Sequence, residues 1–425
     1  MKSDKKKIAV IGLGYVGLPL AVEFGKYHSV VGFDIDKKRI NELKSSNDVT
    51  GELLSNEIAA SNNLKFSYNE KDLAAVDIFI ITVPTDIDKS KRPNLKPLES
   101  ASALVGKYIK NDGIVIFEST VYPGCTEEEC IPIIEEISKL KCNKDFSCGY
   151  SPERIVPGDK SKSFKDILKI TSGSNKKAAK EIDELYSSII CAGTYRAPSI
   201  KVAEAAKIIE NTQRDVNIAL MNELAIIFEK VGIDTNEVLD AAATKWNFTK
   251  YFPGLVGGHC ISVDPYYLYH KALELGYYPE VIASGRRVNN YMGIHVGQKT
   301  IKLLLEKNKD LSNLKILILG FAFKENCGDI RNTGVISIYD ELCSFGVNVK
   351  VYDPIINKDE ATKNYKVNFL KSTPAKNSYD AIILAVPHKI LIERGIDGIK
   401  KYGKKNAILF DVKSAFPKKY SNARL

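Results

Sequence analysis

Short runs of apolar residues alternate with longer segments of helical periodicity over most of the chain. The first run, Ile8–Ile11, is followed at once by a glycine-rich turn and then by a helical pattern. Continuous apolar runs are typical of parallel strands, because helices cover both faces of a parallel sheet. Further strands are expected within 28–36, 75–85, 113–124 and 146–158. The pattern predicts an N-terminal doubly wound α/β domain over residues 1–198.

A second unit of the same kind begins near residue 313. An apolar strand is followed there by a turn at Gly320, a helix, and another strand that ends at Asp353. Further strands are expected within 379–388 and 406–414. The turn lacks the GxGxxG spacing, so this Rossmann-like domain, 309–425, is expected to bind a mononucleotide-like group and not a second dinucleotide.

Between these units, residues 199–232 have helical periodicity and contain no proline. Such a helix is longer than the usual range of about 8 to 20 residues. Its broad apolar faces predict a spine between two domains and an oligomer contact. Lys207 and Asn211 stand four positions apart, so they share one helix face, pointing either into a site or into solvent. A central helical domain is expected over 199–308.

Composition narrows the range of partners. The chain has 425 residues and a net charge of +9, but no basic tract with interleaved aromatic residues, so no nucleic acid partner is expected. The positive charge suits an anionic substrate. No apolar stretch approaches the roughly 18 to 20 residues that span a bilayer, so no membrane partner is expected. The eight cysteines have no CxxC spacing. We therefore expect no metal site, a cytoplasmic location and reduced thiols.

The turn after the first strand has the spacing Gly12-x-Gly14-x-x-Gly17, with Tyr15 and Val16 inside it. The first glycine makes the turn, the second lets the backbone approach a pyrophosphate, and the third lets the helix pack on the strand. This turn predicts a dinucleotide site.

The second strand adds a carboxylate to that site. Asp34 follows Gly12 by 22 residues, where it would bind the ribose hydroxyls and repel a 2′-phosphate. NAD is therefore expected in preference to NADP. Arg39 leaves two interpretations open, because it could accommodate a phosphate or belong to a solvated helix face.

Small polar residues follow the later strands of the first domain. Thr85 and Thr120 stand where the carboxyl ends of parallel strands line a ligand crevice, although strand-ending threonines are also common without function. Glu153 and Arg154 follow the next strand. A carboxylate there is a candidate acid or base, and a plain surface charge is the alternative.

The stretch PGLVGGHCISVDP places Cys260 on a glycine-rich loop, four residues before Asp264. It is either a turn with an incidental thiol or a functional loop. A thiol is useful when an alcohol is oxidised twice, because it adds to the aldehyde, forms a thioester, and releases the acid on hydrolysis. Lys324, Asp329 and Arg331 lie after the first strand of the second unit, where a diphosphate would bind.

Seven motifs together resemble the UDP-glucose/GDP-mannose dehydrogenases, which are nucleotide-sugar 6-dehydrogenases. They are GLGYVGLPLA, STVYPG, SPERIVPG, AEAAKIIENTQRDVNIA, PGLVGGHCISVDPYYL, GRRVNN and GFAFKENCGDIRNT, and the resemblance runs from Ile8 to about Phe416. It implies two Rossmann-like domains joined by a long central helix and a helical dimerisation domain, with NAD as cofactor. It also implies a homodimer built on that helix.

The cysteine loop is most similar to members that act on UDP-N-acetylhexosamines. The resemblance thus implies four-electron oxidation of C6 of UDP-GlcNAc or UDP-GalNAc to the uronic acid, for capsules, O-antigens and other surface polysaccharides. UDP-glucose and UDP-N-acetylmannosamine are the alternative substrates. Members specific for UDP-glucose often carry an arginine where this chain has Thr244-Lys245, which disfavours UDP-glucose. A catalytically silent sensor is disfavoured, because it would not need Cys260, Lys207 and Asp264 together.

The resemblance also implies roles for individual residues. Cys260 is similar to the nucleophile, and Lys207, with Asn211 beside it, to the group that stabilises the oxyanion. Asp264 is similar to the carboxylate that orients water or activates the thiol. Glu153 resembles a general base, with Thr120 helping to hold water. Expected substrate contacts are Glu153, Arg154, Lys207, Asn211, Tyr251, Gly254, Gly257 and Lys324. Expected cofactor contacts are Gly12, Gly14, Tyr15, Val16, Gly17, Asp34, Arg39, Thr85, Thr120 and Arg331.

Two further residues of these loops, His259 and Asn326, are given no catalytic role. His259 is expected to pack in the loop and not to act as a base, since Lys207 and Asp264 fill that role in the resemblance. The sequence KENCGDIRN departs from the commoner form of its loop, so the sequence assigns no role to Asn326.

Overall fold

A computed structural model describes residues 6–88, 90–155, 163–307 and 310–425. The chain forms two compact units. The first unit is Met1–Glu210 with Tyr266–Tyr277, and the second unit is Asn211–Pro265 with Tyr278–Leu425. The division into three domains stays a prediction, and its boundary at 308–309 lies outside the described residues.

The first unit contains a six-stranded sheet in which all neighbours are parallel. Its order is β3-β2-β1-β4-β7-β8, the dinucleotide-binding order of doubly wound folds. The strands are β1 (Ile8–Ile11), β2 (Val30–Phe33), β3 (Leu64–Ser67), β4 (Ile78–Ile81), β7 (Ile114–Phe117) and β8 (Ser147–Tyr150). The predicted α/β fold with a Rossmann domain is confirmed.

The strands β2, β4, β7 and β8 are each shorter than the apolar segment that predicted them. Within 75–85 and 113–124, the ladder ends before Pro84 and Pro123, which have no N–H to donate to a neighbouring strand. Within 146–158, the strand ends at Tyr150, and 156–158 lie outside the described residues.

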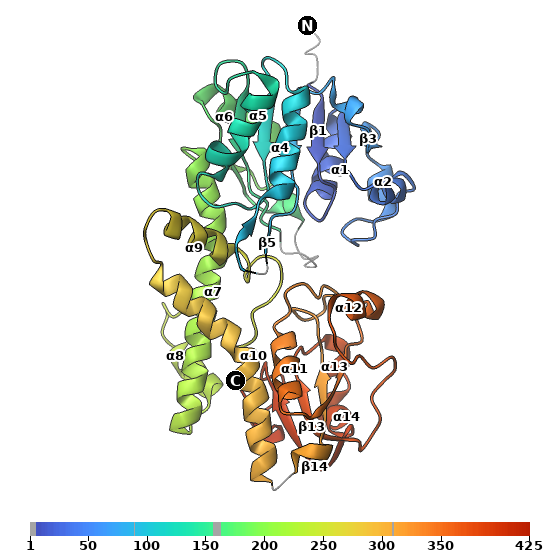
Figure 1. Cartoon of the computed structure of the whole chain (residues 1–425), viewed down its shortest axis with the longest axis vertical. Coiled ribbons are helices and arrows are strands. Elements are labelled where there is room, and N and C mark those ends of the chain that lie inside the picture. Colours follow the sequence, from blue (N-terminus) through green and yellow to red (C-terminus); the bar gives the residue numbers. More distant parts are fainter. Residues whose placement is uncertain (1–5, 89, 156–162, 308–309) are drawn as a thin grey trace. The chain divides into compact units, whose positions relative to one another are not determined.

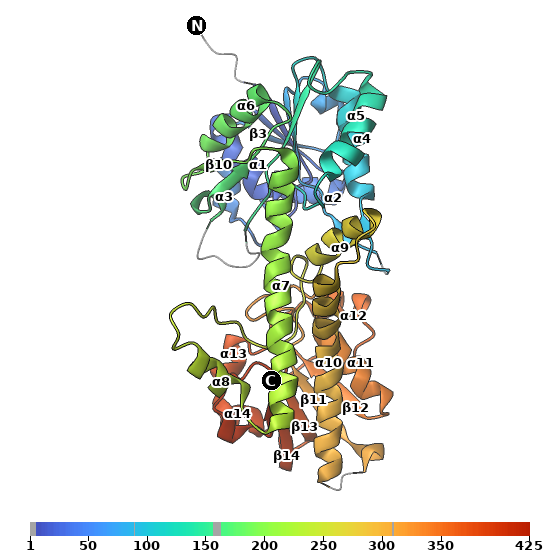
Figure 2. The ribbon, with the colours of Figure 1, turned by 90° about the vertical axis from the view of Figure 1, so that its left-hand side faces the viewer.

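Helices cover both faces of this sheet. Helices α1 (Gly17–Tyr27), α2 (Lys37–Lys44) and α6 (Lys176–Ser187) bury apolar side chains against alternate strand residues such as Ile8, Val10, Ile78 and Ile80. Helices α4 (Lys96–Tyr108) and α5 (Ile131–Ser138) lie on the opposite face from α1 and α6 (Figure 2). Smaller elements are α3 (Ser55–Ala59), β5 (Asp86–Ile87), β6 (Pro93–Asn94), β9 (Lys169–Thr171) and β10 (Thr194–Arg196).

The second unit contains a five-stranded parallel sheet of order β12-β11-β13-β14-β15. Two of its strands, β13 and β14, are labelled in Figure 1. Its strands are β11 (Lys315–Leu319), β12 (Asn348–Tyr352), β13 (Tyr379–Leu384), β14 (Gly403–Asp411) and β15 (Ala423–Arg424). This is the other common doubly wound order. The strand order, and not the strand direction, reverses between the first and third strands, β11 and β13. It supports the expectation of a mononucleotide-like ligand.

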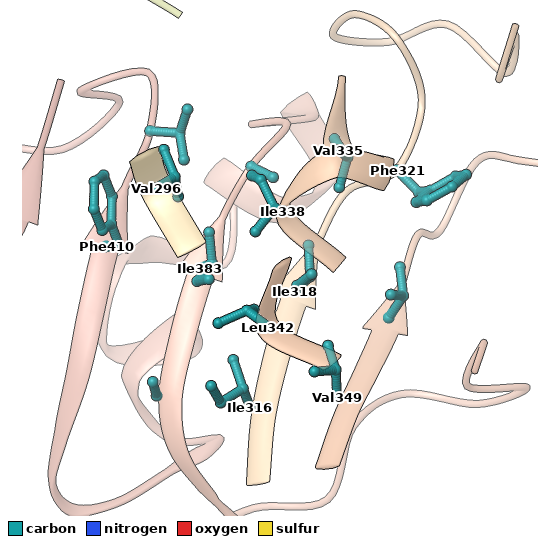
Figure 3. Close-up of a cluster of buried hydrophobic side chains, with 14 of the residues drawn as sticks. Val296, Ile316, Ile318, Phe321, Val335, Ile338, Leu342, Val349, Ile383 and Phe410 are labelled. Carbon is teal, nitrogen blue, oxygen red and sulfur yellow. The ribbon is translucent and has the colours of Figure 1, made fainter. Parts of the chain in front are cut away.

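The core of the second unit joins this sheet to two helices. Ile338 and Leu342 of α11 (Val335–Ser344) pack on Ile316 and Ile318 of β11, and Val296 of α10 (Glu280–Glu306) completes the layer (Figure 3). The remaining helices of this unit are α8 (Thr235–Ala242), α12 (Lys358–Asn364), α13 (Lys389–Ile392) and α14 (Gly395–Lys400).

The long helix is one uninterrupted element. Helix α7 spans Ile200–Val231 and runs from the first unit into the second (Figure 2), which confirms the helix predicted at 199–232. Helix α9 (Asp264–Glu274) follows the cysteine loop. No helix among the described residues is both long and apolar enough to cross a bilayer, and no group of three metal-binding side chains occurs in that part of the chain.

Candidate active site

The glycine turn of the first unit is tightly packed at one end and open at the other. A Cβ on Gly17 would lie 1.9 Å from the carbonyl oxygen of Gly12 and 2.3 Å from Oγ1 of Thr82. Gly12 itself has a φ of +93°, in the region that favours glycine. A Cβ on Gly14 would meet no heavy atom of the described residues within 4 Å. The open side of the turn therefore fits the approach of a pyrophosphate.

Asp34 closes this turn from the end of β2. Its Oδ2 accepts a hydrogen bond from the backbone N–H of Leu13 at 2.8 Å, and its Oδ1 accepts from the N–H of Asp36 at 2.9 Å. The structure thus joins Asp34 to the glycine turn, as the dinucleotide prediction requires.

Arg39 is not on a solvated face. It is 8% exposed, its Nε donates to the carbonyl of Leu13 at 3.0 Å, and its Nη2 lies 2.8 Å from Oδ1 of Asp48. The solvated-face interpretation is therefore wrong, because the guanidinium anchors the glycine turn. Direct contact of Arg39 with the cofactor stays a prediction.

The other predicted residues of the first unit follow neighbouring strands. Thr85 follows β4, Thr120 follows β7, and Glu153 follows β8. Since β1, β4, β7 and β8 are adjacent and parallel, these residues and the glycine turn share one edge of the sheet. Tyr15 and Val16 lie in the turn itself, with Val16 capping α1.

Glu204, which the sequence analysis missed, holds the loop that carries Thr120. Its carboxylate, buried in α7, accepts hydrogen bonds from the N–H groups of Gly124 at 2.6 Å and Thr126 at 2.9 Å. Burial raises the pKa of Glu204 to about 7, against the opposing effect of these hydrogen bonds. Only the fold reveals this contact, which joins residues about 80 positions apart.

Glu153 is held on both oxygens. Its Oε1 accepts from the N–H groups of Arg154 at 2.7 Å and Ile155 at 3.0 Å, and its Oε2 accepts from Nζ of Lys169 at 2.8 Å. The Glu153 side chain is 9% exposed, so the surface-charge interpretation is wrong. The guanidinium of Arg154 pairs with Glu210 at 2.8 Å within the same unit.

In the second unit, Cys260 lies one turn before a helix. Its carbonyl oxygen accepts from the N–H groups of Val263 at 3.0 Å and Asp264 at 2.8 Å, which starts α9. Asp264 is 3% exposed, and its Oδ2 accepts from Nδ2 of Asn211 at 2.6 Å. Lys207 lies one turn before Asn211 along α7. The structure therefore places the predicted carboxylate and amide together beside the cysteine loop.

The glycine pair of the cysteine loop packs against the chain itself. A Cβ on Gly257 would lie 2.7 Å from the carbonyl oxygen of Asn332, and a Cβ on Gly258, at φ +88°, would lie 2.8 Å from the ring of Phe323. Gly258 also donates its N–H to the carbonyl of Arg331 at 3.2 Å. These glycines permit a close backbone contact that fixes the cysteine loop to the loop after β11.

That second loop carries the residues expected to bind a diphosphate. Nε of Arg331 donates to Oδ1 of Asp329 at 3.0 Å, and its Nη2 donates to Oδ2 at 2.6 Å. Nζ of Lys324 lies 5.5 Å from the centre of the Phe323 ring. The structure gives the Arg331 guanidinium a fixed orientation on Asp329, and its contact with ligand stays a prediction.

A buried polar network holds the other end of the cysteine loop. Asn222 of α7 exchanges hydrogen bonds with the backbone of Gly254, at 2.7 and 3.0 Å, and donates to Asn289 at 2.8 Å. Asn289 and Arg286 of α10 both donate to Oδ1 of Asp215, at 2.7 and 2.6 Å. The motif GRRVNN, to which the sequence analysis gave no role, contributes two of these residues. Tyr251, Gly254 and Gly257 all lie on this loop between α8 and α9.

The second unit has a carboxylate in the position that Asp34 has in the first. Oδ2 of Asp353, at the end of β12, accepts from the N–H of Phe321 at 2.7 Å. Unlike Asp34, Asp353 is fully buried, because Nε2 of His388 lies on the same oxygen at 2.9 Å. Burial alone would raise the pKa of Asp353, but the His388 contact and the backbone N–H groups lower it to about 2. A side chain therefore closes the corner where a dinucleotide ribose would bind.

The loop that follows β11 sets the state of that histidine. Nδ1 of His388 accepts from the N–H of Asn326 at 2.9 Å, so its Nε2 carries the proton and donates to Asp353. Asn326 has a φ of +57°, and its Oδ1 accepts from the N–H of Lys389 at 2.7 Å. This explains Asn326, whose role the sequence left open.

Three sequence profiles match consecutive parts of the chain. They describe the NAD binding domain (6–190), the central domain (201–291) and the UDP binding domain (317–418) of one family. This chain belongs to the UDP-glucose/GDP-mannose dehydrogenase family. Members are NAD-dependent oxidoreductases that act on nucleotide sugars, and the glycine turn with Asp34 fits NAD as the cofactor of this dehydrogenase.

Relatives of this dehydrogenase are similar over nearly their whole length. UDP-N-acetyl-D-glucosamine 6-dehydrogenase of Pseudomonas aeruginosa is 52% identical over 419 residues, or 99% of both chains. Protein CapL of Staphylococcus aureus is 52% identical over 408 residues, or 96% of both. The solved structure of UDP-D-ManNAc dehydrogenase from Pyrococcus horikoshii matches with a TM-score of 0.87 and 29% identity, covering 98% of both chains.

Proposed function

We propose that this dehydrogenase oxidises the C6 hydroxymethyl group of a UDP-N-acetylhexosamine, and UDP-GlcNAc first of all, to the uronic acid. The observation that carries the proposal is the cysteine loop, in which Cys260 precedes α9 and the Asp264–Asn211 pair. The substrate is supported by the names of the relatives at 52% identity. The product would enter surface polysaccharide biosynthesis, as the resemblance implies.

The proposed mechanism assigns the chemistry to the residues for which the resemblance implies a role. NAD, when bound, supplies the hydride acceptor for both oxidations. Lys207 takes the proton of the C6 hydroxyl and stabilises the oxygen as charge develops on it. The thiol of Cys260 adds to the aldehyde carbon, and this thiohemiacetal becomes a thioester after the second oxidation.

Hydrolysis of the thioester needs an activated water. Glu153 accepts a proton from that water, and Thr120 and Asp264 orient it. The acid leaves, and Cys260 is released as the thiol. Because this chemistry needs a reduced thiol, we also propose a cytoplasmic location.

Substrate choice can be tested with a panel of nucleotide sugars. We expect UDP-GlcNAc or UDP-GalNAc to give the highest kcat/KM in NADH formation, ahead of UDP-ManNAc and UDP-glucose at matched concentrations. Two NADH should form for each sugar consumed. Faster turnover of UDP-glucose would contradict the substrate proposal and leave the family assignment intact.

We also propose a homodimer built on α7. Five apolar residues recur along one side of this helix and are 44% to 64% exposed in the single chain: Val202, Ile209, Leu220, Ile227 and Val231. Exposed apolar residues along one side of a helix suit burial against a second copy. Sedimentation analysis should give twice the chain mass of 47.2 kDa, and Leu220→Glu should shift it toward the monomer. A wild-type chain that sediments as a monomer would refute the dimer.

A further inference from the structure

A buried ionic cluster adjoins the predicted base Glu153 in the first unit. Glu118 follows β7, Lys169 begins β9, and Tyr186 belongs to α6. The side chains of Glu118 and Lys169 are 0% and 3% exposed, and Tyr186 is fully buried. No assigned role uses these three residues, although buried charges are costly unless they are paired.

Lys169 stands between two carboxylates. Its Nζ lies 2.9 Å from Oε2 of Glu118 and 2.8 Å from Oε2 of Glu153. The hydroxyl of Tyr186 donates to the other oxygen of Glu118, and the Tyr186 ring centre lies 5.4 Å from Nζ. Burial would lower the pKa of Lys169, but the two carboxylates raise it above its usual value, so the ammonium stays charged.

These contacts define how Glu153 can act. Its Oε1 already accepts two backbone N–H groups, and a carboxylate oxygen has about two acceptor positions. Its Oε2 accepts one hydrogen bond, from Lys169, so among the described residues one acceptor position is left on that oxygen. The two backbone N–H groups therefore leave Oε2 as the oxygen that can take a proton, and Lys169 determines in which direction.

We propose that Lys169, held in place by Glu118, is the positioning residue that orients Glu153 toward the water that hydrolyses the covalent intermediate. The inference rests on the proposed function, in which Glu153 is the base. It predicts a selective effect, because formation of the thioester on Cys260 does not need Glu153, whereas its hydrolysis does. A purely structural lysine would weaken both stages together.

The test uses the full-length enzyme with NAD and UDP-GlcNAc. Lys169→Met is expected to lower kcat by about 100-fold, the contribution of one positioned general base. KM should fall with it, because slower breakdown of a covalent intermediate lowers both constants and leaves kcat/KM nearly unchanged. Intact-mass analysis after acid quenching should show the sugar attached at Cys260. Lys169→Arg should restore most of the rate. Lys165→Met, which removes a lysine 3.6 Å from Glu23 outside the cluster, is the matched control and should behave as wild type.

The pH profile gives a second readout. In Lys169→Met, Glu118 and Glu153 face each other without the ammonium, with the Tyr186 hydroxyl on Glu118 and Arg154 engaged by Glu210. Like charges disfavour ionisation, so the acid limb of kcat should move to higher pH. If Lys169→Met does not fold, Glu118→Gln, which weakens the hold on Lys169, should slow hydrolysis by about tenfold and accumulate the same adduct.

The outcomes separate the two proposals. A wild-type enzyme that forms neither acid nor adduct from any UDP-sugar refutes the proposed function. A wild-type enzyme that works, together with a folded Lys169→Met or Glu118→Gln enzyme that hydrolyses the thioester at the normal rate, overturns the role of Lys169. Equal loss of adduct formation and hydrolysis overturns it as well.

Discussion

Cys260→Ala is expected to lower uronic acid formation by about a thousandfold or more, as removal of a catalytic nucleophile commonly does. The alanine enzyme has no atom that can form the thiohemiacetal, so aldehyde chemistry is the most it can perform. The backbone of the loop should be unaffected, because its hydrogen bonds use main-chain atoms of Cys260 and the contacts of Gly258. Acid formation is measured directly, with folding checked by NAD binding.

Replacing Cys260 by serine distinguishes a chemical role of the thiol from a packing role, because serine is similar in size but is a poorer nucleophile. Cys260→Ser is expected to block acid release and to build up an ester-linked adduct slowly, because an oxygen ester hydrolyses less readily than a thioester. Cys327→Ala, at a half-buried cysteine of the same unit, is the matched control and should keep most activity. If Cys260→Ala retains most of the activity, the thiol is incidental and the loop is a plain turn.

Gly17→Ala and Gly14→Ala are expected to separate folding from cofactor binding. The Cβ that Gly17→Ala introduces would overlap the carbonyl oxygen of Gly12, which is backbone and cannot move aside. We expect Gly17→Ala to lower the free energy of unfolding of the first unit by about 2 to 4 kcal/mol and to abolish NAD binding.

The partner variant should behave differently. The Cβ that Gly14→Ala introduces enters space that the described residues leave open, so thermal unfolding without cofactor should match wild type within about 1 °C. That space is where a pyrophosphate would lie, so NAD affinity should fall by about tenfold or more. Thermal unfolding with and without NAD measures both effects. Unchanged stabilisation of the Gly14→Ala enzyme by NAD would place the pyrophosphate elsewhere.

Local patterns predicted the elements whose signals are local. Strand β1 and helix α7 match the sequence predictions to within a residue at each end, since one has a glycine turn after it and the other has uninterrupted periodicity. The strand order of the second unit could not be predicted from local patterns, because it depends on how the helices that connect the strands pack on the sheet. The ends of β4 and β7 were overestimated, since apolar residues continue past the ladder into loops.

The sequence predicted one part of the candidate site, the residues expected to contact ligands, but not the residues that hold them in place. Glycine spacing and the cysteine loop pointed to the residues that would contact ligands, and the structure joins Asp264 to Asn211 as expected. The residues that hold these side chains and loops in place could not be predicted, because their contacts are distant in sequence. Lys169 contacts Glu118 across 51 positions of the chain, and Asn222 contacts Asn289 across 67. The solvated-face interpretation of Arg39 failed for the same reason, since its partner Asp48 is brought near by a loop.

Because His388 closes the corner at Asp353, the glycine turn of the first unit is the one dinucleotide-type corner left open among the described residues. Oxidation of an alcohol to an acid removes two hydrides, so this place must be emptied and refilled in the middle of each turnover. If only noncovalent contacts held the aldehyde intermediate, the fraction of it that dissociates would increase with the time that this cofactor exchange takes. In the proposed mechanism, a covalent bond to Cys260 would make the yield of acid independent of the exchange rate, so scarce cofactor would slow the enzyme without releasing free aldehyde.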